Sequence, residues 1–384
     1  MIIWASMLLP LITIISLILF FRCKIVWWEY LLVLGIPALT ILGIKLGVEA
    51  SQVSCTEYWG GYLTKAAYYE KWDEYIHQTC SRQYACGTDS EGNTRYCTEF
   101  YDCSYVAHHP EYWETNNSLG ETFSIDRSYF EHLCKLWGSR TFTDMKRNFH
   151  SYDGDAYLTA YDQNRDHLIG TTTKHHYENR VQASHSIFNF REFKKGEAGA
   201  LGLYDHPNVG NFFQPCMLGP WSAEDRAKGE KAVGYVNAVL GRPSKVRVYV
   251  LLWVDKTLQV SHEQEAYWKG GNKNELVICA GMSSATPGKV EWARVFGWTK
   301  NEELKIQVRD YMLANKMLDV TGLGQLLETS ISGKVVRRDF REFAYLTVDP
   351  PKSAVIWTLV VTFLLCLGLA WFVIVNEINQ EKGE

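Results

Sequence analysis

Apolar and polar positions divide the chain into two apolar ends and a polar middle of about 300 residues. Residues 2–21 and 354–375 contain no charged side chain, and residues 27–47 contain only Glu29 and Lys45, each close to an end of the run. A helix needs about 20 apolar residues to cross a bilayer, and long charged side chains at its ends can reach the interface. The pattern therefore predicts two transmembrane helices at the N-terminus and one at the C-terminus.

The link between the first two apolar runs is short and contains Arg22 and Lys24. Positively charged residues beside transmembrane helices mark the cytoplasmic side. We therefore expect the N-terminus and residues 49–350 to lie outside the cytoplasm and residues 376–384 to form a cytoplasmic tail. This topology suits a protein of the bacterial inner membrane whose main domain is periplasmic or extracellular.

Four cysteines in the polar middle are spaced symmetrically, because Cys80 and Cys86 are six residues apart, as are Cys97 and Cys103. In an antiparallel hairpin with its turn in residues 88–94, Cys80 would lie directly opposite Cys103, and Cys86 opposite Cys97, all on one face. The competing interpretation is a four-thiolate zinc site, but such sites usually have two to four residues between paired cysteines, and here there are five. We therefore predict two cross-strand disulfides, which persist mainly outside the reducing cytoplasm.

Residues 49–232 are typical of an aromatic, disulfide-rich region dominated by β-strands. The helical spacing of Tyr129, Leu133 and Leu136 predicts one short helix over residues 126–137.

A second hairpin is expected over residues 153–173, with a polar turn in its middle. Asp162, Asn164 and Asp166 alternate there as in a calcium-binding loop. However, the sixth position of that loop is a histidine and the twelfth a threonine, where an EF-hand has glycine and glutamate. We therefore favour a polar turn over a metal site.

The pattern changes from residue 233 onward. An apolar run over residues 245–254 is suited to a buried strand. After it we expect a helical stretch at residues 261–268 and two further apolar strands at residues 274–282 and 290–298. A second helix, which begins with a capping box, is expected from Glu302. The order β-α-β-β-α predicts a layered α/β subdomain over residues 233–350. Together with the hairpin region it makes an α+β extracytoplasmic domain on helical membrane anchors.

The segment YWKGGNKNELVICAGM carries a resemblance to a known family through Trp268, Gly271, Lys273, Asn274 and the strand 276–278. With the following strand and helix, residues 236–316 resemble a TPM domain, a family often tethered to a membrane. The resemblance implies a layered α/β fold and a hydrolase that acts on phosphate esters.

The whole chain also resembles uncharacterised membrane-anchored proteins of bacteria and phages, notably in YYEKWDEYIHQTC and HHYENRVQAS. This second resemblance implies an envelope location and no particular activity.

Charge and motifs narrow the function classes. The net charge is −4 without a basic stripe, so we expect no nucleic-acid partner. No nucleotide-binding loop, dinucleotide fingerprint, nucleophile elbow or HExxH metal motif occurs, and we expect no cofactor or metal. Cys216 lacks an identifiable histidine partner and is interpreted as a bridge or buried thiol rather than a nucleophile. The local groupings that could still contribute to a site are His108-His109, His175-His176 and Asp205-His206.

We therefore expect a membrane-anchored extracytoplasmic protein of the cell envelope with a binding or assembly role rather than a catalytic one. Its partners would be the lipid bilayer and either another protein or further copies of this chain. The alternative is a TPM-like, membrane-tethered hydrolase.

Overall fold

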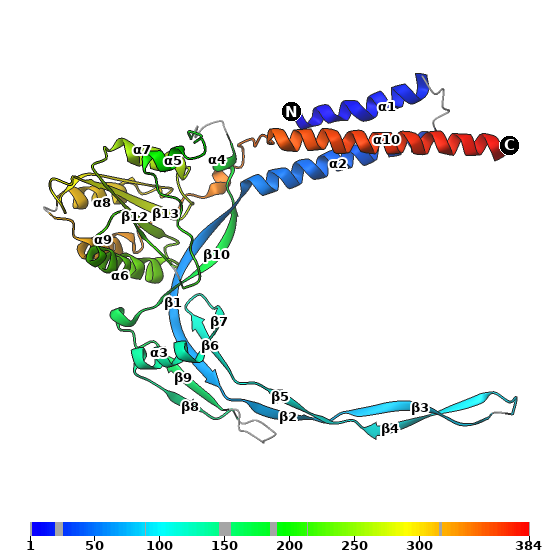
Figure 1. Cartoon of the computed structure of the whole chain (residues 1–384), viewed down its shortest axis with the longest axis horizontal. Helices are drawn as coiled ribbons and strands as arrows, with labels where there is room; N and C mark the ends of the chain where they lie inside the picture. The colour runs from blue at the N-terminus through cyan, green and yellow to red at the C-terminus, as the bar shows by residue number, and fades with distance from the viewer. Residues whose placement is uncertain are drawn as a thin grey trace.

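The computed structural model describes residues 2–19, 26–88, 90–145, 155–184, 190–212, 214–314 and 317–383. Three parts are distinguished in space: a helix bundle, an outer domain and a long β-ribbon, residues 72–109, which we call the arm (Figure 1). The bundle and the arm extend from the outer domain in the same direction, so the molecule has the outline of a letter C (Figure 1).

The bundle joins both ends of the chain. It consists of η1 (Ile2–Met7), α1 (Leu8–Leu19), α2 (Trp27–Val53) and α10 (Lys352–Gly383). Apolar side chains of all three α-helices meet in a small core, with Ile14, Leu17, Val33 and Val373 buried. The N-terminus lies at the end of the bundle beside the outer domain, and the C-terminus lies at the far end (Figure 1).

Two of these helices, α2 and α10, are long and apolar enough to cross a membrane. The first apolar run forms a shorter helix over Ile3–Leu19, so its crossing stays a prediction. Arg22 and Lys24, on which the expected orientation depends, lie outside the described residues. The expected tail after residue 375 continues as part of α10 up to Gly383, so this segment is helical.

The outer domain begins with β1 (Ser54–Tyr69), which follows α2 directly. This strand is long enough to pair with three others. Its first half pairs with β10 (Gly170–Glu178), and its second half lies between β6 (Tyr112–Asn117) and β9 (Ala156–Ala160). The edge strands are β7 (Thr122–Ile125) and β8 (Thr141–Thr143).

The helix expected near residues 126–137 is present as α3 (Arg127–Trp137). The Asp126 side chain caps its N-terminus by accepting a hydrogen bond from the Tyr129 amide. Phe130, Leu133 and Trp137 are buried and form a small core against the second half of the β1 sheet.

The prediction of a hairpin over residues 153–173 is wrong. β9 and β10 do not pair with each other, because each pairs with a different half of β1, and η2 (Arg165–His167) lies in the link between them. The turn residues in that link serve the local backbone. The Asp162 and Asn164 side chains accept hydrogen bonds from the amides of Asn164 and Asp166.

The second part of the outer domain is a four-stranded sheet of order β11-β12-β13-β14, in which only the last pair is antiparallel. Its strands are β11 (Met217–Leu218), β12 (Arg247–Val254), β13 (Glu275–Met282) and β14 (Val290–Gly297). Its longer helices are α6 (Ala223–Leu240), α7 (Gln259–Tyr267), α8 (Glu302–Ala314) and α9 (Val320–Ile331). The remaining short helices are α4 (Arg180–Ala183), α5 (Glu197–Leu201) and η3 (Phe340–Phe343).

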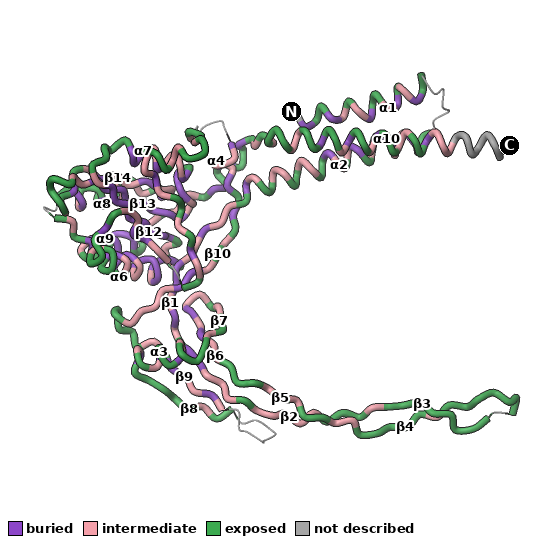
Figure 2. Tube along the Cα trace, viewed as in Figure 1, coloured by how far each residue is buried: buried purple, intermediate pink, exposed green. Residues whose placement is uncertain are grey.

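The main core lies in this sheet, where β12 and β13 are buried along almost their whole length (Figure 2). Helices α6 and α9 lie on one face, and α5 and α7 lie on the other (Figure 1). The observed order from β12 to α8 is the expected β-α-β-β-α. The boundary expected at residue 233 falls inside α6, whose buried residues pack on this sheet.

Candidate functional site

The arm is the least buried folded segment of the outer domain (Figure 2). Strands β2 (Trp72–Ile76) and β5 (Tyr105–His109) pair at its base, and β3 (Thr79–Thr88) and β4 (Thr94–Asp102) pair beyond them. Strands rise about 3.3 Å per residue, so residues 72–88 reach roughly 55 Å from the sheet. A two-stranded ribbon without a core is marginally stable in water. The arm therefore depends on local cross-links.

Two disulfides supply those cross-links, and they join the pairs expected from the sequence, Cys80–Cys103 and Cys86–Cys97. The expected register is nevertheless wrong. Cys80 lies opposite Tyr101, and Cys97 lies opposite Tyr84, so each disulfide runs diagonally across the ribbon. The Cα–Cα distances of 5.8 and 5.6 Å lie within the usual range for disulfides, so direct opposition is not required.

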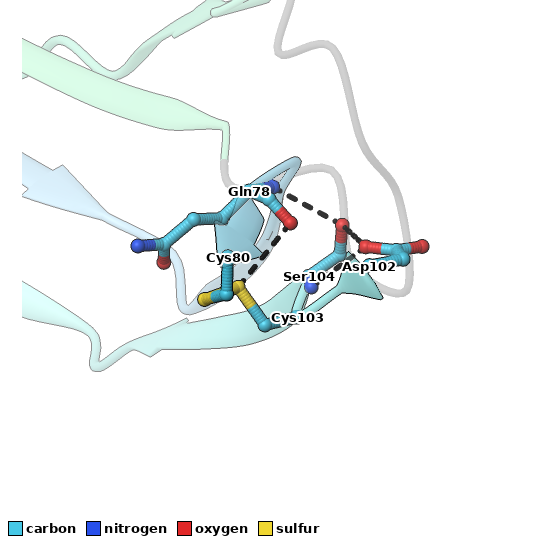
Figure 3. Close-up of a disulfide and its surroundings, with 5 residues drawn as sticks. All are labelled: Gln78, Cys80, Asp102, Cys103 and Ser104. Carbon is cyan, nitrogen blue, oxygen red and sulfur yellow. Dashed lines mark hydrogen bonds between the residues drawn. A yellow bond between two sulfur atoms is a disulfide. The ribbon is translucent and has the colours of Figure 1, made fainter. Parts of the chain in front are cut away.

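A hydrogen-bonded turn supports the disulfide nearer to the base (Figure 3). The Cys103 amide donates to the Gln78 carbonyl at 2.9 Å, and the Gln78 amide donates to the Ser104 hydroxyl oxygen at 3.1 Å. The Ser104 hydroxyl and amide both donate to Asp102, and these bonds hold the pKa of that carboxyl below its usual range. The junction between the two halves of the arm is thereby fixed in place.

Side chains alternate between the two faces of the ribbon, and the faces differ in chemistry. One face carries both disulfides, the ion pair between Arg82 and Glu99, at 2.8 Å, and the less exposed rings of Tyr84 and Tyr101. The opposite face of the paired β3 and β4 residues carries no charge until the end of β4; its members are Thr79, Ser81, Gln83, Ala85, Tyr96, Thr98, Phe100 and Asp102. We call this second face the aromatic face.

Two large rings dominate the aromatic face. Phe100 is 72% exposed and Tyr96 is 65% exposed. They lie opposite Ser81 and Ala85, whose small side chains leave the rings uncovered. Phe100 and Tyr96 were not singled out from the sequence, although they lie three residues and one residue from Cys97, odd separations that already place them on the face opposite to the disulfides.

The histidine doublet His108-His109 lies at the base of the arm. The His108 Nδ1 atom lies 2.6 Å from Asp73 Oδ1, and the His109 Nε2 atom lies 3.0 Å from Glu74 Oε2. The His109 ring also stacks on Trp72, with ring centroids 4.3 Å apart. Each histidine thus makes a separate cross-strand contact, and the doublet holds the base of the arm together.

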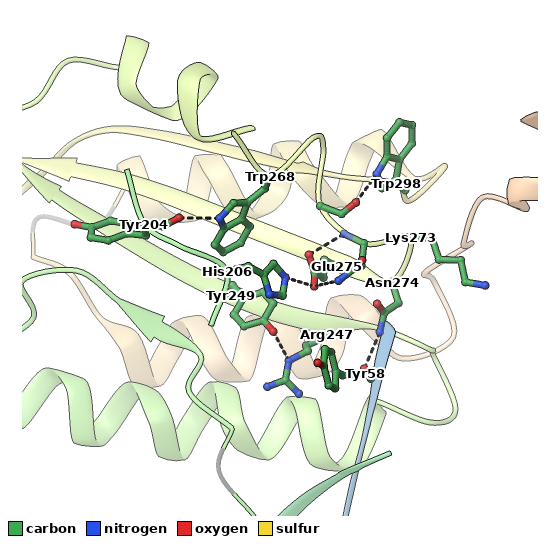
Figure 4. A network of polar contacts seen from close by, with 12 residues as sticks. Tyr58, Tyr204, His206, Arg247, Tyr249, Trp268, Lys273, Asn274, Glu275 and Trp298 are labelled. Atoms are coloured by element: carbon green, nitrogen blue, oxygen red, sulfur yellow. Dashed lines mark hydrogen bonds and ion pairs between the residues drawn. The ribbon is translucent and has the colours of Figure 1, made fainter. Parts of the chain in front are cut away.

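A second polar cluster lies inside the α/β part of the outer domain (Figure 4). His206 Nε2 lies 2.7 Å from Glu275 Oε1, and the Glu275 side chain is only 1% exposed. Burial works against the charged forms of both groups, but the charge and hydrogen bond of each partner prevail, so the pKa of His206 is raised and the pKa of Glu275 is lowered. The backbone and side chain of Asn272 also donate to Glu275, each at 2.8 Å.

Arg247 is the other buried charge in this cluster. It is 1% exposed, and its Nε donates to the Tyr249 hydroxyl at 2.7 Å. Both Arg247 and Glu275 stand at the first residue of their strands, β12 and β13. Ligands of parallel α/β sheets usually bind at the opposite, carboxyl ends of the strands. The position of this cluster therefore favours a role in joining the four-stranded α/β part of the outer domain to β1.

That joint is built around a buried carboxylate on β1. Both Glu57 oxygens accept hydrogen bonds from Arg337 at 3.0 Å, Lys273 Nζ lies 3.4 Å from one of them, and the Glu57 side chain is 2% exposed. Burial lowers the pKa of Lys273, and the attraction of Glu57, which raises this pKa, offsets only part of the effect. Next along the strand, the Tyr58 carbonyl accepts a hydrogen bond from the Asn274 side chain at 2.8 Å (Figure 4).

The other residues singled out from the sequence are not brought together. His175 stacks on Trp59, and His176 contacts the Thr56 hydroxyl. Cys216 is buried against Glu230, and burial raises the pKa of its thiol well above the usual value, as befits a buried thiol rather than a nucleophile. Within the described ranges, no three His, Cys, Asp or Glu side chains form a group suited to a metal ion.

Comparison with known proteins finds no match among family models, curated proteins or solved structures. The function of this chain must therefore be argued from its own geometry.

Proposed function

We propose that this chain is an integral membrane protein whose extracytoplasmic domain presents the arm to a protein in the same membrane. The observation that carries the proposal is the arm itself, a stiff ribbon with Phe100 and Tyr96 held in solvent on an uncharged face. Exposed aromatic side chains are enriched at protein interfaces, because they bury a large area at low entropic cost.

Aromatic residues at both ends of the bundle support membrane insertion. Trp357 and Trp371 are exposed on α10 and are separated by about 21 Å of helix. On α2, Trp27 and Lys45 are separated by about 27 Å, and Lys45 Nζ lies 5.5 Å from the ring centroid of Trp4. These separations approach the hydrocarbon thickness of about 30 Å, and tryptophan is enriched at both membrane interfaces.

The first apolar run is also long enough to cross the hydrocarbon layer. The six residues of η1 rise about 2.0 Å each and the twelve of α1 about 1.5 Å each, which adds up to roughly 30 Å. The N-terminus would then share a side with the outer domain, and the C-terminus would lie on the other side (Figure 1). The two disulfides support an oxidising compartment for the outer domain.

The direction of the arm supports a partner in the same membrane. The arm runs in the same direction as the bundle, and its tip reaches as far along as the C-terminal end of α10 (Figure 1). Its strands have unpaired outer edges, and Arg82 and Glu99 are charged, so it is not suited to contact with lipid. A protein surface must therefore shelter it, supplied by a membrane neighbour or a second copy of this chain.

A photo-crosslinking amino acid at Phe100 tests this proposal in cells that make the protein. We expect a discrete adduct with another membrane protein or with a second copy, detected by mass spectrometry. The matched control is the same probe at Arg82, on the disulfide face, where we expect a much weaker adduct. Adducts of equal yield from both faces, or none from Phe100, would contradict the proposal.

The alternative, a membrane-tethered hydrolase, rests on the TPM resemblance alone. The buried pair of His206 and Glu275 is at the end of the sheet that serves the joint with β1. We therefore favour the binding or assembly function.

A further inference from the structure

A cavity of about 510 Å³ lies where α2 leaves the bundle and meets β10 and α4. Its volume lies within the range of small-molecule sites. Its lining includes Leu46, Glu49, Ala50, Val53, Glu178 and Arg180.

The two walls of this cavity differ in polarity. The α2 wall presents the apolar side chains of Leu46, Ala50 and Val53. The opposite wall is polar and centres on Arg180, whose Nε lies 2.6 Å from Glu178 and whose Nη1 lies 2.9 Å from Glu49 of α2, so the polar group joins the two walls. Two carboxylates and one guanidinium leave this group with a net charge of −1.

The position of the cavity along α2 matches the headgroup layer of a bilayer. The contact between Lys45 and Trp4 marks the outer edge of the hydrocarbon, and Leu46 is the next residue. From Leu46 to Ala50 the helix rises about 6 Å. The headgroup layer on each side of the hydrocarbon is about 5–8 Å thick. The apolar wall therefore spans that layer.

We propose that this cavity binds a phospholipid with a primary ammonium headgroup, phosphatidylethanolamine, from the leaflet that faces the outer domain. The ammonium donates to Glu49 and Glu178, the phosphate lies toward Arg180, and the root of an acyl chain lies along Leu46 and Ala50. This assignment rests on the proposed membrane insertion.

The charges of the polar wall select among headgroups. A primary ammonium offers three N–H donors to the two carboxylates, and the phosphate and ammonium charges of phosphatidylethanolamine cancel, so this lipid adds no net negative charge to the group. Phosphatidylcholine has no N–H donor, so it cannot make these bonds. Phosphatidylglycerol is anionic and is repelled by the same carboxylates.

Lipid retention by the full chain tests the assignment. The protein is reconstituted in vesicles with equal amounts of the three phospholipids, extracted in mild detergent, and analysed by native mass spectrometry. We expect about tenfold enrichment of phosphatidylethanolamine over phosphatidylcholine, as charge-assisted hydrogen bonds of this kind allow. The double variant Glu49→Gln/Glu178→Gln should lose the enrichment, and Ala50→Trp, which fills the cavity from its apolar wall, should lose the lipid.

The matched control is Glu302→Gln, because Glu302 is an exposed carboxylate on α8 whose partner is Lys305. It should retain the enrichment. A protein that resists carbonate extraction but shows no lipid preference would overturn this inference and leave the proposed function standing. Extraction by carbonate would overturn both. Equal loss in Glu302→Gln and in the double variant would overturn the role of the two cavity carboxylates.

Discussion

Gly60 of β1 lies directly against Gly241, which follows the last turn of α6. A Cβ atom on Gly241 would lie 2.6 Å from the Cα of Gly60, and a Cβ atom on Gly60 would lie 1.9 Å from the carbonyl oxygen of Asn237. The membrane-linked strand and the α/β part therefore touch backbone to backbone, and the contact leaves no room for any side chain.

We expect Gly60→Ala to lower the free energy of unfolding by about 3 kcal/mol, because the added methyl group forces the two backbones apart. Thermal unfolding in detergent, followed by tryptophan fluorescence, measures the change. The matched control is Gly234→Ala within α6, where a Cβ meets nothing within 4 Å. That variant should be neutral or stabilising by about 0.5–1 kcal/mol. Equal destabilisation by both changes would contradict the close contact.

Removal of the disulfide nearer to the tip of the arm by Cys86→Ser/Cys97→Ser should loosen the far half of the arm and leave the outer domain folded. A native disulfide is typically worth about 2–4 kcal/mol, and here the loss is confined to a ribbon without a core of its own. Limited proteolysis should cut residues 80–103 much faster than in the unchanged protein. The control Cys134→Ser removes a free thiol on α3 and should leave the arm resistant. Unchanged protection in the double variant would show that the arm is held by other contacts.

The change Glu57→Gln should destabilise the joint by about 3–5 kcal/mol, because it leaves the charges of Arg337 and Lys273 without their buried partner. The matched control is Glu342→Gln, which breaks the exposed pair with Lys300 and should cost less than about 1 kcal/mol. Thermal unfolding of the two variants side by side provides the comparison. A small loss in Glu57→Gln would mean that the joint depends mainly on backbone packing.

The pair of His206 and Glu275 should make stability depend on pH in a defined direction. The raised pKa of His206 means that its contribution is complete below about pH 6.5 and is lost as the pH rises through the raised value. The lowered pKa of Glu275 means that its contribution is complete above about pH 4.3 and is lost on further acidification.

The change His206→Asn keeps a neutral donor for Glu275 and removes the titration. Because the His206 side chain is 32% exposed, we expect a loss of only about 1 kcal/mol near pH 6, shrinking toward pH 8. Thermal unfolding at both pH values measures it. A difference from the unchanged protein that grows with pH would contradict this assignment.

Topology can be tested with single cysteines introduced at Ala227, an exposed residue on α6 of the outer domain, and at Gln380, near the C-terminus. A membrane-impermeant thiol reagent should label the first and not the second in intact cells, and both after lysis. The unchanged protein, with its own free cysteines, gives the background. The reverse labelling pattern would overturn the orientation of the chain.

Local patterns predicted much of the fold. The apolar runs of β12, β13 and β14 and the stripe of α3 depend on neighbours along the chain, and these elements are present. α8 is also present, but its cap is Asn301, which accepts a hydrogen bond from the Leu304 amide, and not the Thr299 of the expected capping box. α6 was missed, because its sequence mixes charged residues and glycines with the apolar stripe. The hairpin at residues 153–173 failed for another reason. The partner of β9 and β10 is β1, about a hundred residues away, and strand pairing over that separation leaves no local signal.

The candidate site was predictable only in part. Equal spacing of the cysteines identified the disulfide partners, but a bulge between Ala85 and Gly87 and diagonal bonding set a register that spacing does not encode. The aromatic face follows from the alternation of side chains along a strand once the strands are placed. Arg247 and Glu275 are charges within otherwise apolar runs, a signal of a buried polar cluster that was not used. The histidine partner of Glu275 comes from a separate loop and could not be read from the sequence.

The direct passage from Val53 of α2 to Ser54 of β1 has a consequence for insertions and deletions. One residue added to a helix turns everything beyond it by about 100°, whereas one residue added to a strand exchanges its two faces. Without a loop at this passage, neither change can be absorbed locally. The rotational phase of α2 in the helix bundle is thus tied to the direction of the arm, and the number of residues between them should tolerate almost no variation.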